Sequence, residues 1–266
     1  MAHEAKNGKV SDMKRRWGMS IDLDKCTGCG ACQLACNQEN NMPIFTDDSD
    51  IPKRVVFLDL MKVTYAKDEK AKYGEVKVAF IPKMCQQCSG NDPEHPKPPC
   101  VSVCPVVATD VGDDGVVSQI WSRCIGCRYC QASCPYEARV FNWWSARYEG
   151  SFKESLNPEV SIASRGTIVK CTFCSHIWKR ERDRLVAKGV TDINAVQYTP
   201  ACVAACPQRA LDFGDLAELR KKYGDVRQIV PLPDPTQTDP ALVIKPHRDA
   251  ARAAERGAEV ANWEEV

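Results

Sequence analysis

The chain has no long apolar segment and no excess of charge of either sign. Its most apolar stretches, Val55–Met61 and Val76–Ile81, are short and interrupted by charged residues, whereas a membrane-spanning helix needs about 20 apolar residues. Lysine and arginine number 36, aspartate and glutamate 35, and the formal net charge is +1. We therefore expect neither a transmembrane helix nor the basic surface that nucleic-acid binding requires.

Catalytic motifs are also missing. The sequence has no nucleophile beside a base, no phosphate-binding glycine loop and no molybdenum-site signature. Lys14-Arg15-Arg16 resembles part of a twin-arginine export signal, but no apolar stretch follows it. We therefore expect a chain that is no enzyme on its own and that would depend on a partner's signal for any export.

Cysteine is the one residue type in clear excess. The 16 cysteines form four groups of four, with none left over. Disulfide frameworks belong to much shorter secreted chains and do not produce this grouping, whereas metal sites do. Group one is Cys26, Cys29, Cys32 and Cys36; group two is Cys85, Cys88, Cys100 and Cys104; group three is Cys124, Cys127, Cys130 and Cys134; group four is Cys171, Cys174, Cys202 and Cys206.

Groups one and three have the spacing C-x2-C-x2-C-x3-C, which is typical of ferredoxins. Three cysteines of such a motif bind one [4Fe–4S] cluster and the fourth binds the neighbouring cluster. Gly28, Gly30 and Gly126 fit this loop, because a backbone that approaches a cluster closely leaves little room for a Cβ atom.

Groups two and four keep the same ending but carry an insertion before their third cysteine. Taken alone, a C-x2-C pair with a distant C-x3-C also fits a zinc ribbon, so a structural zinc protein is one alternative. An internal repeat, C-V-x-x-C-P-x-x-A-x-x-x-G-D, begins at Cys100 and again at Cys202, and group three repeats its C-P-x-x-A part. The repeated unit favours half of a two-cluster ferredoxin.

The gaps between groups predict how they pair. Groups two and three are separated by 19 residues, as in ferredoxins, whereas the other gaps are 48 and 36 residues. Groups one and four must then form the second pair. With the fourth ligand exchanged inside each pair, the predicted sites are Cys26, Cys29, Cys32 and Cys206 (site 1); Cys85, Cys88, Cys100 and Cys134 (site 2); Cys124, Cys127, Cys130 and Cys104 (site 3); and Cys171, Cys174, Cys202 and Cys36 (site 4).

The predicted fold class is α+β, with two loop-rich, ferredoxin-like two-cluster domains and β-hairpin insertions. Alternating apolar residues predict hairpins over 54–81, with a charged turn at Lys67–Lys72, and over 108–121; residues 177–188 favour a helix. The expected domains are a flexible arm (1–16), a discontinuous domain (17–80 plus 151–230) for groups one and four, a domain (81–150) for groups two and three, and an extended tail (231–266), too polar for a core, that docks a partner subunit.

The four cysteine groups, in the order tight, loose, tight, loose, resemble the four-cluster iron–sulfur subunits of DMSO reductase/polysulfide reductase-type complexes. Cys124-Ile-Gly-Cys-Arg-Tyr-Cys130 and Cys134-Pro-Tyr-Glu-Ala-Arg139 carry this resemblance over roughly residues 17–230. Asn40-Asn-Met-Pro43 and Arg139–Trp144 are most similar to the iron–sulfur subunits of alternative complex III and of the menaquinone reductase complex (Qrc) of sulfate reducers. Some relatives hold a [3Fe–4S] cluster where a group-three cysteine is replaced; because Cys127 is retained, the resemblance implies four [4Fe–4S] clusters.

The resemblance also implies the partners. One end of a four-cluster electron relay would meet a molybdopterin-oxidoreductase-like subunit or, under the menaquinone reductase resemblance, a multihaem cytochrome c. The other end would meet a polytopic, quinone-binding membrane subunit of the polysulfide reductase type, which makes menaquinone reduction one expected role. The chain would then be peripheral, membrane-associated through its partners and on the periplasmic side, with the cytoplasmic side as the alternative.

Two other functions stay open at this point. One is a free polyferredoxin-type carrier; the other is the iron–sulfur subunit of another molybdoenzyme, such as polysulfide, tetrathionate or nitrite reductase or formate dehydrogenase. Several side chains also carry two interpretations. His176 tunes a cluster or lies at the surface; Lys170 and Arg128 raise a cluster potential or are solvated; Trp143, Trp144 and Trp178 contact a partner or pack over a cluster.

Overall fold

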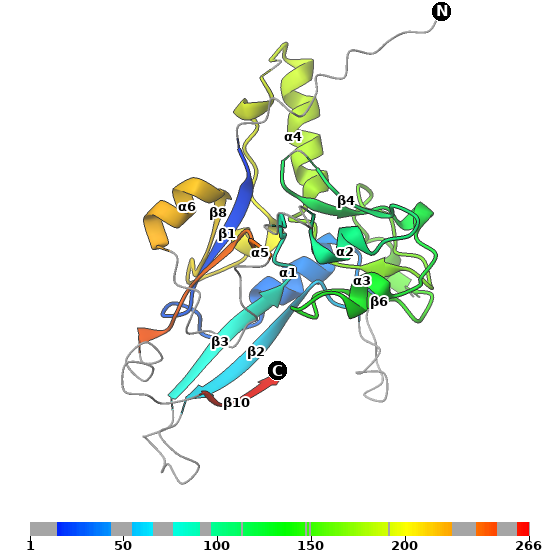
Figure 1. Ribbon diagram of the computed structural model, residues 1–266. Coiled ribbons are helices and arrows are strands. Elements are labelled where there is room, and N and C mark those ends of the chain that lie inside the picture. Colours follow the sequence, from blue (N-terminus) through cyan, green and yellow to red (C-terminus); the bar gives the residue numbers. More distant parts are fainter. Residues whose placement is uncertain are drawn as a thin grey trace, which may run out of the picture.

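The computed structural model describes residues 15–43, 55–65, 77–90, 97–112, 114–146, 148, 150–190, 192–224, 238–248 and 260–265. Across these residues, short helices are mixed with four small sheets, in agreement with the predicted α+β class (Figure 1). None of the helices in these ranges has the length and apolar character needed to cross a bilayer.

The largest part of the core surrounds a three-stranded sheet. Its middle strand, β1 (Trp17–Asp22), pairs antiparallel with β8 (Leu211–Asp215) and parallel with β9 (Leu242–Lys245). Every residue of β1 is buried, and helix α6 (Leu216–Tyr223) packs on the sheet. The carboxylate of Asp215 begins α6 by accepting the N–H groups of Ala217 and Glu218.

The third strand of this sheet corrects the prediction for the tail. Residues 241–244 are at most 5% exposed, so the prediction that the region after Pro231 is too polar to build a core is wrong for this segment. The apolar run Ala-Leu-Val-Ile was concealed by the prolines and charges around it. The rest of the predicted tail, residues 231–237, 249–259 and 266, lies outside the described residues, as do residues 1–14 of the predicted arm.

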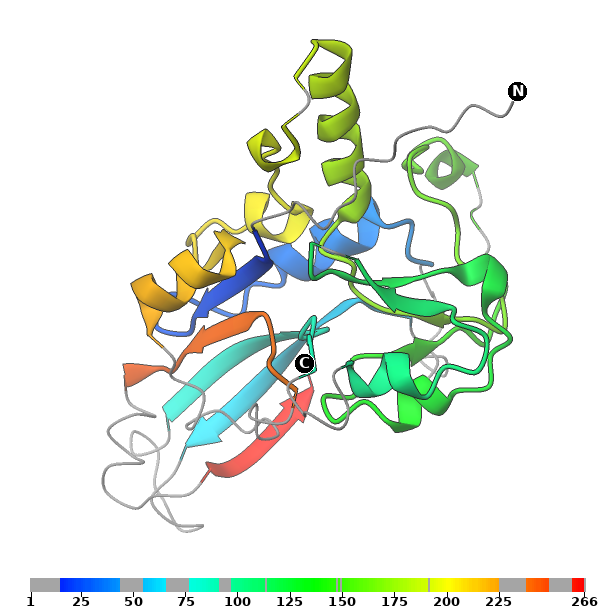
Figure 2. The ribbon, with the colours of Figure 1, turned by 45° about the horizontal axis from the view of Figure 1, so that its top comes forward.

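The predicted hairpins and helix are present. Strands β2 (Leu58–Tyr65) and β3 (Lys77–Met84) pair antiparallel, and β10 (Val260–Glu265) adds a third strand to β2; the predicted turn at Lys67–Lys72 lies outside the described residues. A smaller hairpin joins β4 (Thr109–Val111) to β5 (Val117–Gln119). The predicted charged helix is α4 (Ser175–Ala187), which stands out from the body of the molecule (Figures 1 and 2).

The remaining elements carry or connect the cysteines. Helix α1 (Ala31–Glu39) lies against α5 (Ala201–Ala204), and α2 (Pro99–Ser102) lies against α3 (Tyr129–Ala132). Strands β6 (Val140–Phe141) and β7 (Ile168–Val169) pair antiparallel across the predicted domain boundary at residue 150. Three 3-10 helices complete the described structure: η3 (Trp121–Arg123), η4 (Gly150–Lys153) and η5 (Ile193–Ala195).

Candidate iron–sulfur cluster sites

All 16 cysteines are described, and none is in a disulfide. The four cysteines predicted for site 1 line one pocket with about 350 Å³ of empty space, part of it open to solvent. The four predicted for site 4 line another, with about 290 Å³ of empty space. In each pocket three cysteines come from one cysteine group and the last from the other. Cys206 of group four joins the group-one cysteines in the first pocket, and Cys36 of group one joins the group-four cysteines in the second.

The sulfur atoms of site 4 are close enough to perturb one another. Burial raises the pKa of the Cys171 and Cys174 thiols to about 12 and about 11, and a negative charge on Cys174 contributes to the shift of Cys171. Burial, followed by the charges of Cys171, Cys174 and Cys202, also raises the pKa of Cys36. Four buried thiols that resist ionisation together need a positively charged group to hold them as thiolates.

Sites 1 and 2 have the same pattern. Burial raises the pKa of Cys32 to about 11, and the charges of Cys26 and Cys206 contribute. Burial raises the pKa of Cys88, with contributions from the charges of Cys85, Cys100 and Cys134. The cysteines predicted for these two sites are therefore brought together in space.

The cysteines predicted for site 3 are more loosely connected. Burial raises the pKa of Cys130, and the charge of Cys124 adds to the shift. For Cys104, burial is outweighed by backbone N–H groups, chiefly those of Val106 and Ala108, so its pKa is lowered. Cys127 is exposed at the surface.

Charges also act between cysteines of different predicted sites. The charge of Cys32, of site 1, raises the pKa of Cys202, of site 4, after burial and the site 4 cysteines themselves. The charge of Cys85, of site 2, contributes to the raised pKa of Cys171, of site 4. The charge of Cys100, of site 2, contributes to the raised pKa of Cys130, of site 3. These charge interactions link the predicted site 1 to site 4, site 4 to site 2 and site 2 to site 3.

One backbone conformation recurs in the first C-x-x-C segment of all four cysteine groups. The residue before the second cysteine has a positive φ in each: 71° at Gly28, 71° at Gly126, 50° at Gln87 and 52° at Phe173. The sequence indicated this only where glycine occupies the position. A residue in the left-handed conformation turns the backbone so that neighbouring N–H groups face the cysteine sulfur atoms. Phe173 N, for example, donates to Cys171 Sγ at 3.4 Å.

The structure gives the glycines reasons that add to the predicted one. A Cβ atom on Gly28 would lie 2.6 Å from the Phe80 ring, and one on Gly126 would lie 2.1 Å from the carbonyl oxygen of Gly166. A Cβ on Gly30 would meet no described protein atom within 4 Å, so the requirement there is its φ of 74°. Other parts of the chain therefore explain Gly28 and Gly126.

The repeated C-P-x-x-A motif forms one turn three times. Its fourth residue, Val107, Glu137 or Arg209, has a φ of 49–50°. The turn aims the alanine N–H back at the cysteine: Ala108 N and Ala210 N each lie 3.2 Å from the Sγ atoms of Cys104 and Cys206. The Ala138 N–H likewise opposes the pKa rise that burial gives to Cys134.

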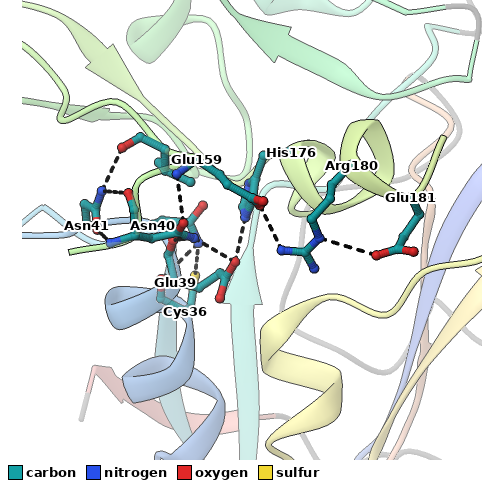
Figure 3. Close-up of polar contacts among 10 residues, drawn as sticks. Cys36, Glu39, Asn40, Asn41, Glu159, His176, Arg180 and Glu181 are labelled. Carbon is teal, nitrogen blue, oxygen red and sulfur yellow. Dashed lines mark hydrogen bonds and ion pairs between the residues drawn. The ribbon is translucent and has the colours of Figure 1, made fainter. Parts of the chain in front are cut away.

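Cys36 lacks this turn, because α1 continues for three residues beyond it. Instead, the side chain of Asn40 donates to the Cys36 carbonyl oxygen at 2.9 Å and lies 3.6 Å from Cys36 Sγ (Figure 3). Asn41, next to it, donates to the carbonyls of Asn157 and Val160 and fixes that loop against α1. The sequence marked these asparagines only by resemblance.

The structure shows the surroundings of several side chains for which the sequence allowed two interpretations. His176 Nε2 lies 2.7 Å from Glu39 Oε1, one residue before Asn40 (Figure 3). Lys170 is 1% exposed and donates to the carbonyls of Val117 and Cys171, so the prediction of a solvated charge is wrong for it. Arg128 is exposed and lies over the Trp143 ring.

The tryptophans separate into two classes. Trp178 is buried at 7% exposure in the main core, which matches the packing interpretation. Trp143 and Trp144 remain 46% and 44% exposed. Whether they contact a partner stays a prediction.

Two further residues beside the cysteines escaped the sequence analysis. Gln87 is fully buried; its amide donates to Cys171 O at 2.6 Å and accepts from Val117 N at 2.8 Å, which joins the chain around sites 2 and 4. Thr238, in the predicted tail, hydrogen-bonds the Tyr136 hydroxyl at 2.6 Å and opposes the pKa rise that burial gives to Cys88. Gln87 is one of the two variable residues of Cys85-x-x-Cys88 and Thr238 lies far from every cysteine group, so cysteine spacing alone could not identify either.

The described residues fit [4Fe–4S] clusters. Sets of thiol donors converge, backbone N–H groups face their sulfur atoms, and some buried donors have no protein acceptor. Tyr198 Oη, beside Cys171, Cys174 and Cys202, and Arg139 Nε and Nη2 are buried without a hydrogen-bond partner. Such atoms are normally satisfied, and cluster sulfides and thiolates would accept from them.

Comparison with known proteins agrees with this chemistry. Residues 17–38 and 117–140 match two family models, each described as a 4Fe-4S binding domain. The cofactors are therefore [4Fe–4S] clusters, and the zinc alternative is rejected for groups one and three, which these models cover.

Relatives that match most of the chain extend this result. The chain is 45% identical over 208 residues to the menaquinone reductase iron-sulfur cluster-binding subunit of Nitratidesulfovibrio vulgaris, covering 77% of each chain. It is 36% identical to the Hdr-like menaquinol oxidoreductase iron-sulfur subunit 1 of Archaeoglobus fulgidus, covering 85% of this chain and 82% of the relative. It is 32% identical to a component of the anaerobic dimethyl sulfoxide reductase of Escherichia coli, covering 96% of this chain and the whole relative. With its cysteine sites and these similarities, the chain belongs to the family of iron–sulfur electron-transfer subunits of menaquinone reductase and dimethyl sulfoxide reductase-type complexes.

Proposed function

We propose that this chain binds four [4Fe–4S] clusters and relays single electrons along them between two partner subunits of a respiratory complex. The ligands are those of the predicted sites 1 to 4. The observation that carries the proposal is that the four cysteines of site 1 line one pocket and the four of site 4 line another. Charge interactions between cysteines also link site 1 to site 4, site 4 to site 2 and site 2 to site 3. A [4Fe–4S] cluster exchanges one electron at a potential that its surroundings set.

Exposure differs along this order in a way that suits a relay. Cys29 of site 1 and Cys127 of site 3 are exposed, whereas all four cysteines of site 4, in the interior of the order, are buried. Electrons would enter and leave at the two exposed ends, and the buried interior would keep water and small oxidants from the clusters between them. The chain's own role is to hold the thiolates, supply N–H donors to their sulfur atoms and exclude solvent.

The partners follow from the relatives. The name of the N. vulgaris relative, a menaquinone reductase subunit, favours menaquinone as the quinone that the complex reduces. One exposed end would meet a molybdopterin-oxidoreductase-like subunit or a multihaem cytochrome c, and the other a polytopic quinone-binding membrane subunit. The chain would be peripheral to the membrane through these partners, on the periplasmic side.

Metal analysis tests the cluster count. Four [4Fe–4S] clusters correspond to about sixteen iron atoms and sixteen acid-labile sulfides per chain. Anaerobically purified protein should also show four spins per chain by electron paramagnetic resonance after full reduction. An iron content near eight per chain would contradict the four-cluster proposal.

Purification from the native membrane tests the partners. A relay subunit should stay with its complex through a high-salt wash, whereas a free polyferredoxin carrier should be released. Co-purification of a multihaem cytochrome would select the menaquinone reductase type of complex. Release of the chain as a monomer that retains its clusters would overturn the proposal of a complex subunit in favour of a carrier.

A further inference from the structure

A buried arginine lies between the cysteines of sites 2 and 3. Arg139 is 2% exposed, one residue before β6. Its Nη1 donates to Thr109 Oγ1 at 3.2 Å and to Gln119 Oε1 at 2.9 Å, which fixes the guanidinium beneath the β4–β5 hairpin. Both acceptors are neutral, so they orient the cation without balancing its charge.

Thiols are the remaining acceptors around the guanidinium. Nε and Nη2 are buried without a well-formed hydrogen bond, and hydrogen bonding with Arg139 contributes to the pKa shifts of Arg139 itself, through Cys100, and of Cys130. No carboxylate pairs with Arg139 among the described residues. A buried cation with no counter-charge is strongly unfavourable, and a protein retains one where an anion is held opposite it.

Cysteines of both sites supply the negative charge around it. Burial lowers the pKa of Arg139, but charges on Cys100, Cys130 and Cys85 more than reverse this effect. In return, Arg139 lowers the pKa of Cys130 and of Cys104, against the effect of burial. Cys85 and Cys100 belong to site 2, and Cys104 and Cys130 to site 3, so one cation faces the ligands of two neighbouring sites.

Charge arithmetic shows what this placement does. Four thiolates around an oxidised [4Fe–4S]²⁺ core carry about −2, and one-electron reduction makes this about −3. A fixed positive charge favours the more negative state, and it acts over a short distance in a region without water. The same cation attracts an electron on either site, which offsets part of the repulsion between electrons on both.

We propose that Arg139 is a shared positioning and tuning residue that raises the reduction potentials of the clusters at sites 2 and 3 together. The proposal rests on the proposed four-cluster function. An arginine suits this role because its charge persists at every accessible pH and its planar group presents donors toward two sides.

The test is a redox titration of the intact complex, followed by electron paramagnetic resonance, for the wild type, Arg139→Gln and Arg139→Lys. Arg139→Gln should lower two of the four potentials, with at least a tenfold fall in the ratio of reduced to oxidised cluster at fixed potential, or about 59 mV for one electron. In Arg139→Lys the two potentials should lie between those of the wild type and Arg139→Gln, because lysine keeps the positive charge but lacks the planar, multi-donor guanidinium. The matched control is Arg123→Gln, which removes an exposed cation beside Cys124 and should leave all four potentials within a twofold change in that ratio.

Each outcome decides the proposal. Unchanged potentials in Arg139→Gln at full iron content would overturn it, as would a shift of one cluster alone. If Arg139→Gln loses iron, the Arg139→Lys variant decides. Full iron content in Arg139→Lys would show that the positive charge is required. Loss of iron in both variants would mean that Arg139 acts only by packing, and this would overturn the proposal. A wild-type complex with fewer than four clusters would instead contradict the proposed function, whatever the variants do.

Discussion

The half of the molecule around sites 1 and 4 is organised by a hydrophobic sheet, whereas the half around sites 2 and 3 is organised by cysteines. In the first half, β1, β8 and β9 place Met19, Ile21 and Leu242 in the main core, each at most 2% exposed. In the second, the described residues 97–146 form four-residue helices and short hairpins. Apart from Cys130, their buried apolar side chains are Ala108, Val116, Val117 and Tyr136.

This difference shows that the two halves depend on the clusters to different degrees. A sheet with buried aliphatic residues on both faces can persist by hydrophobic burial. A region with few buried apolar groups and a buried arginine cannot, and for such regions the free energy of metal binding becomes free energy of folding. In the half around sites 2 and 3, we therefore expect the clusters to take the place of a hydrophobic core.

Cluster removal should separate the halves and gives the largest effect we expect. After anaerobic chelation, amide exchange in β4 and β5 should accelerate by at least about a thousandfold, because their opening free energy falls toward zero. Exchange in β1, β8 and β9 should change far less. Hydrogen-exchange mass spectrometry at measured iron contents checks this. Equal acceleration in both halves would break the comparison.

A cavity in β9 tests whether the tail belongs to the hydrophobic half. Leu242 is 2% exposed, so Leu242→Ala should lower the free energy of unfolding by about 2–5 kcal/mol. Leu34→Ala, at a position that is 71% exposed, is the control and should change it by less than about 0.5 kcal/mol. Guanidinium unfolding of the holoprotein followed by circular dichroism measures both. Equal values would mean that β9 adds nothing to the core.

The hairpin over β2 and β3 and helix α4 could be anticipated because each depends on local periodicity, and the [4Fe–4S] chemistry because it depends on local cysteine spacing. Strand β9 could not, since its partner β1 lies more than 200 residues earlier and only the fold reveals a parallel pairing. Spacing also predicted which cysteine groups pair; that assignment still awaits its test.

The surroundings of the cysteines were harder to predict than the cysteines themselves. Glycine marked the left-handed position at the start of groups one and three, but Gln87 and Phe173 adopt it at the start of groups two and four, where no glycine announces it. Burial of Lys170 and Arg139 was also invisible, because the sequence reports charge but not the carbonyls and thiols that surround it. Electrostatic environment is a property of the assembled fold.

A third prediction concerns Asp239, which ties the halves together. Its carboxylate accepts from Arg16 and Arg220 in the sheet half and from Ser89, next to Cys88 of site 2. Burial raises its pKa, but the hydrogen bonds from Ser89 and Arg220 and the charge of Arg16 hold the pKa well below its usual range. A carboxyl group whose pKa is lower in the folded state stabilises the fold when the pH is above its pKa in the unfolded state. This stabilisation is lost as the pH falls through its pKa in the folded state.

Asp239→Asn should therefore lower the free energy of unfolding by about 1–3 kcal/mol at pH 7. The gap to the wild type should narrow progressively below about pH 5. Guanidinium unfolding at a series of pH values, under anaerobic conditions, measures this gap. Glu154→Gln, at an exposed carboxylate, is the control and should stay within about 0.5 kcal/mol of the wild type throughout. A gap that is constant with pH would show that Asp239 acts by packing rather than by charge.

The smallest predicted effect concerns Asn40, which lies beside Cys36, the one fourth cysteine of a group that lacks the C-P-x-x-A turn. Cys104, Cys134 and Cys206 receive a backbone N–H from the C-P-x-x-A turn, which no side-chain substitution removes. Of these four cysteines, Cys36 is the one to which a described side chain donates, so Asn40→Leu removes one donor from the sulfur atoms of site 4. A hydrogen bond to the sulfur stabilises the more negative reduced state. The potential of that cluster should therefore fall by less than about 59 mV, a tenfold change in the ratio of reduced to oxidised cluster.

Asn41→Gly is the control, since it loses the contacts to Asn157 and Val160 and keeps the positive φ. It should reduce the free energy of unfolding and leave the potential unchanged. Equal shifts in both variants would mean that the loop, and not the donor at the sulfur, sets the potential at site 4.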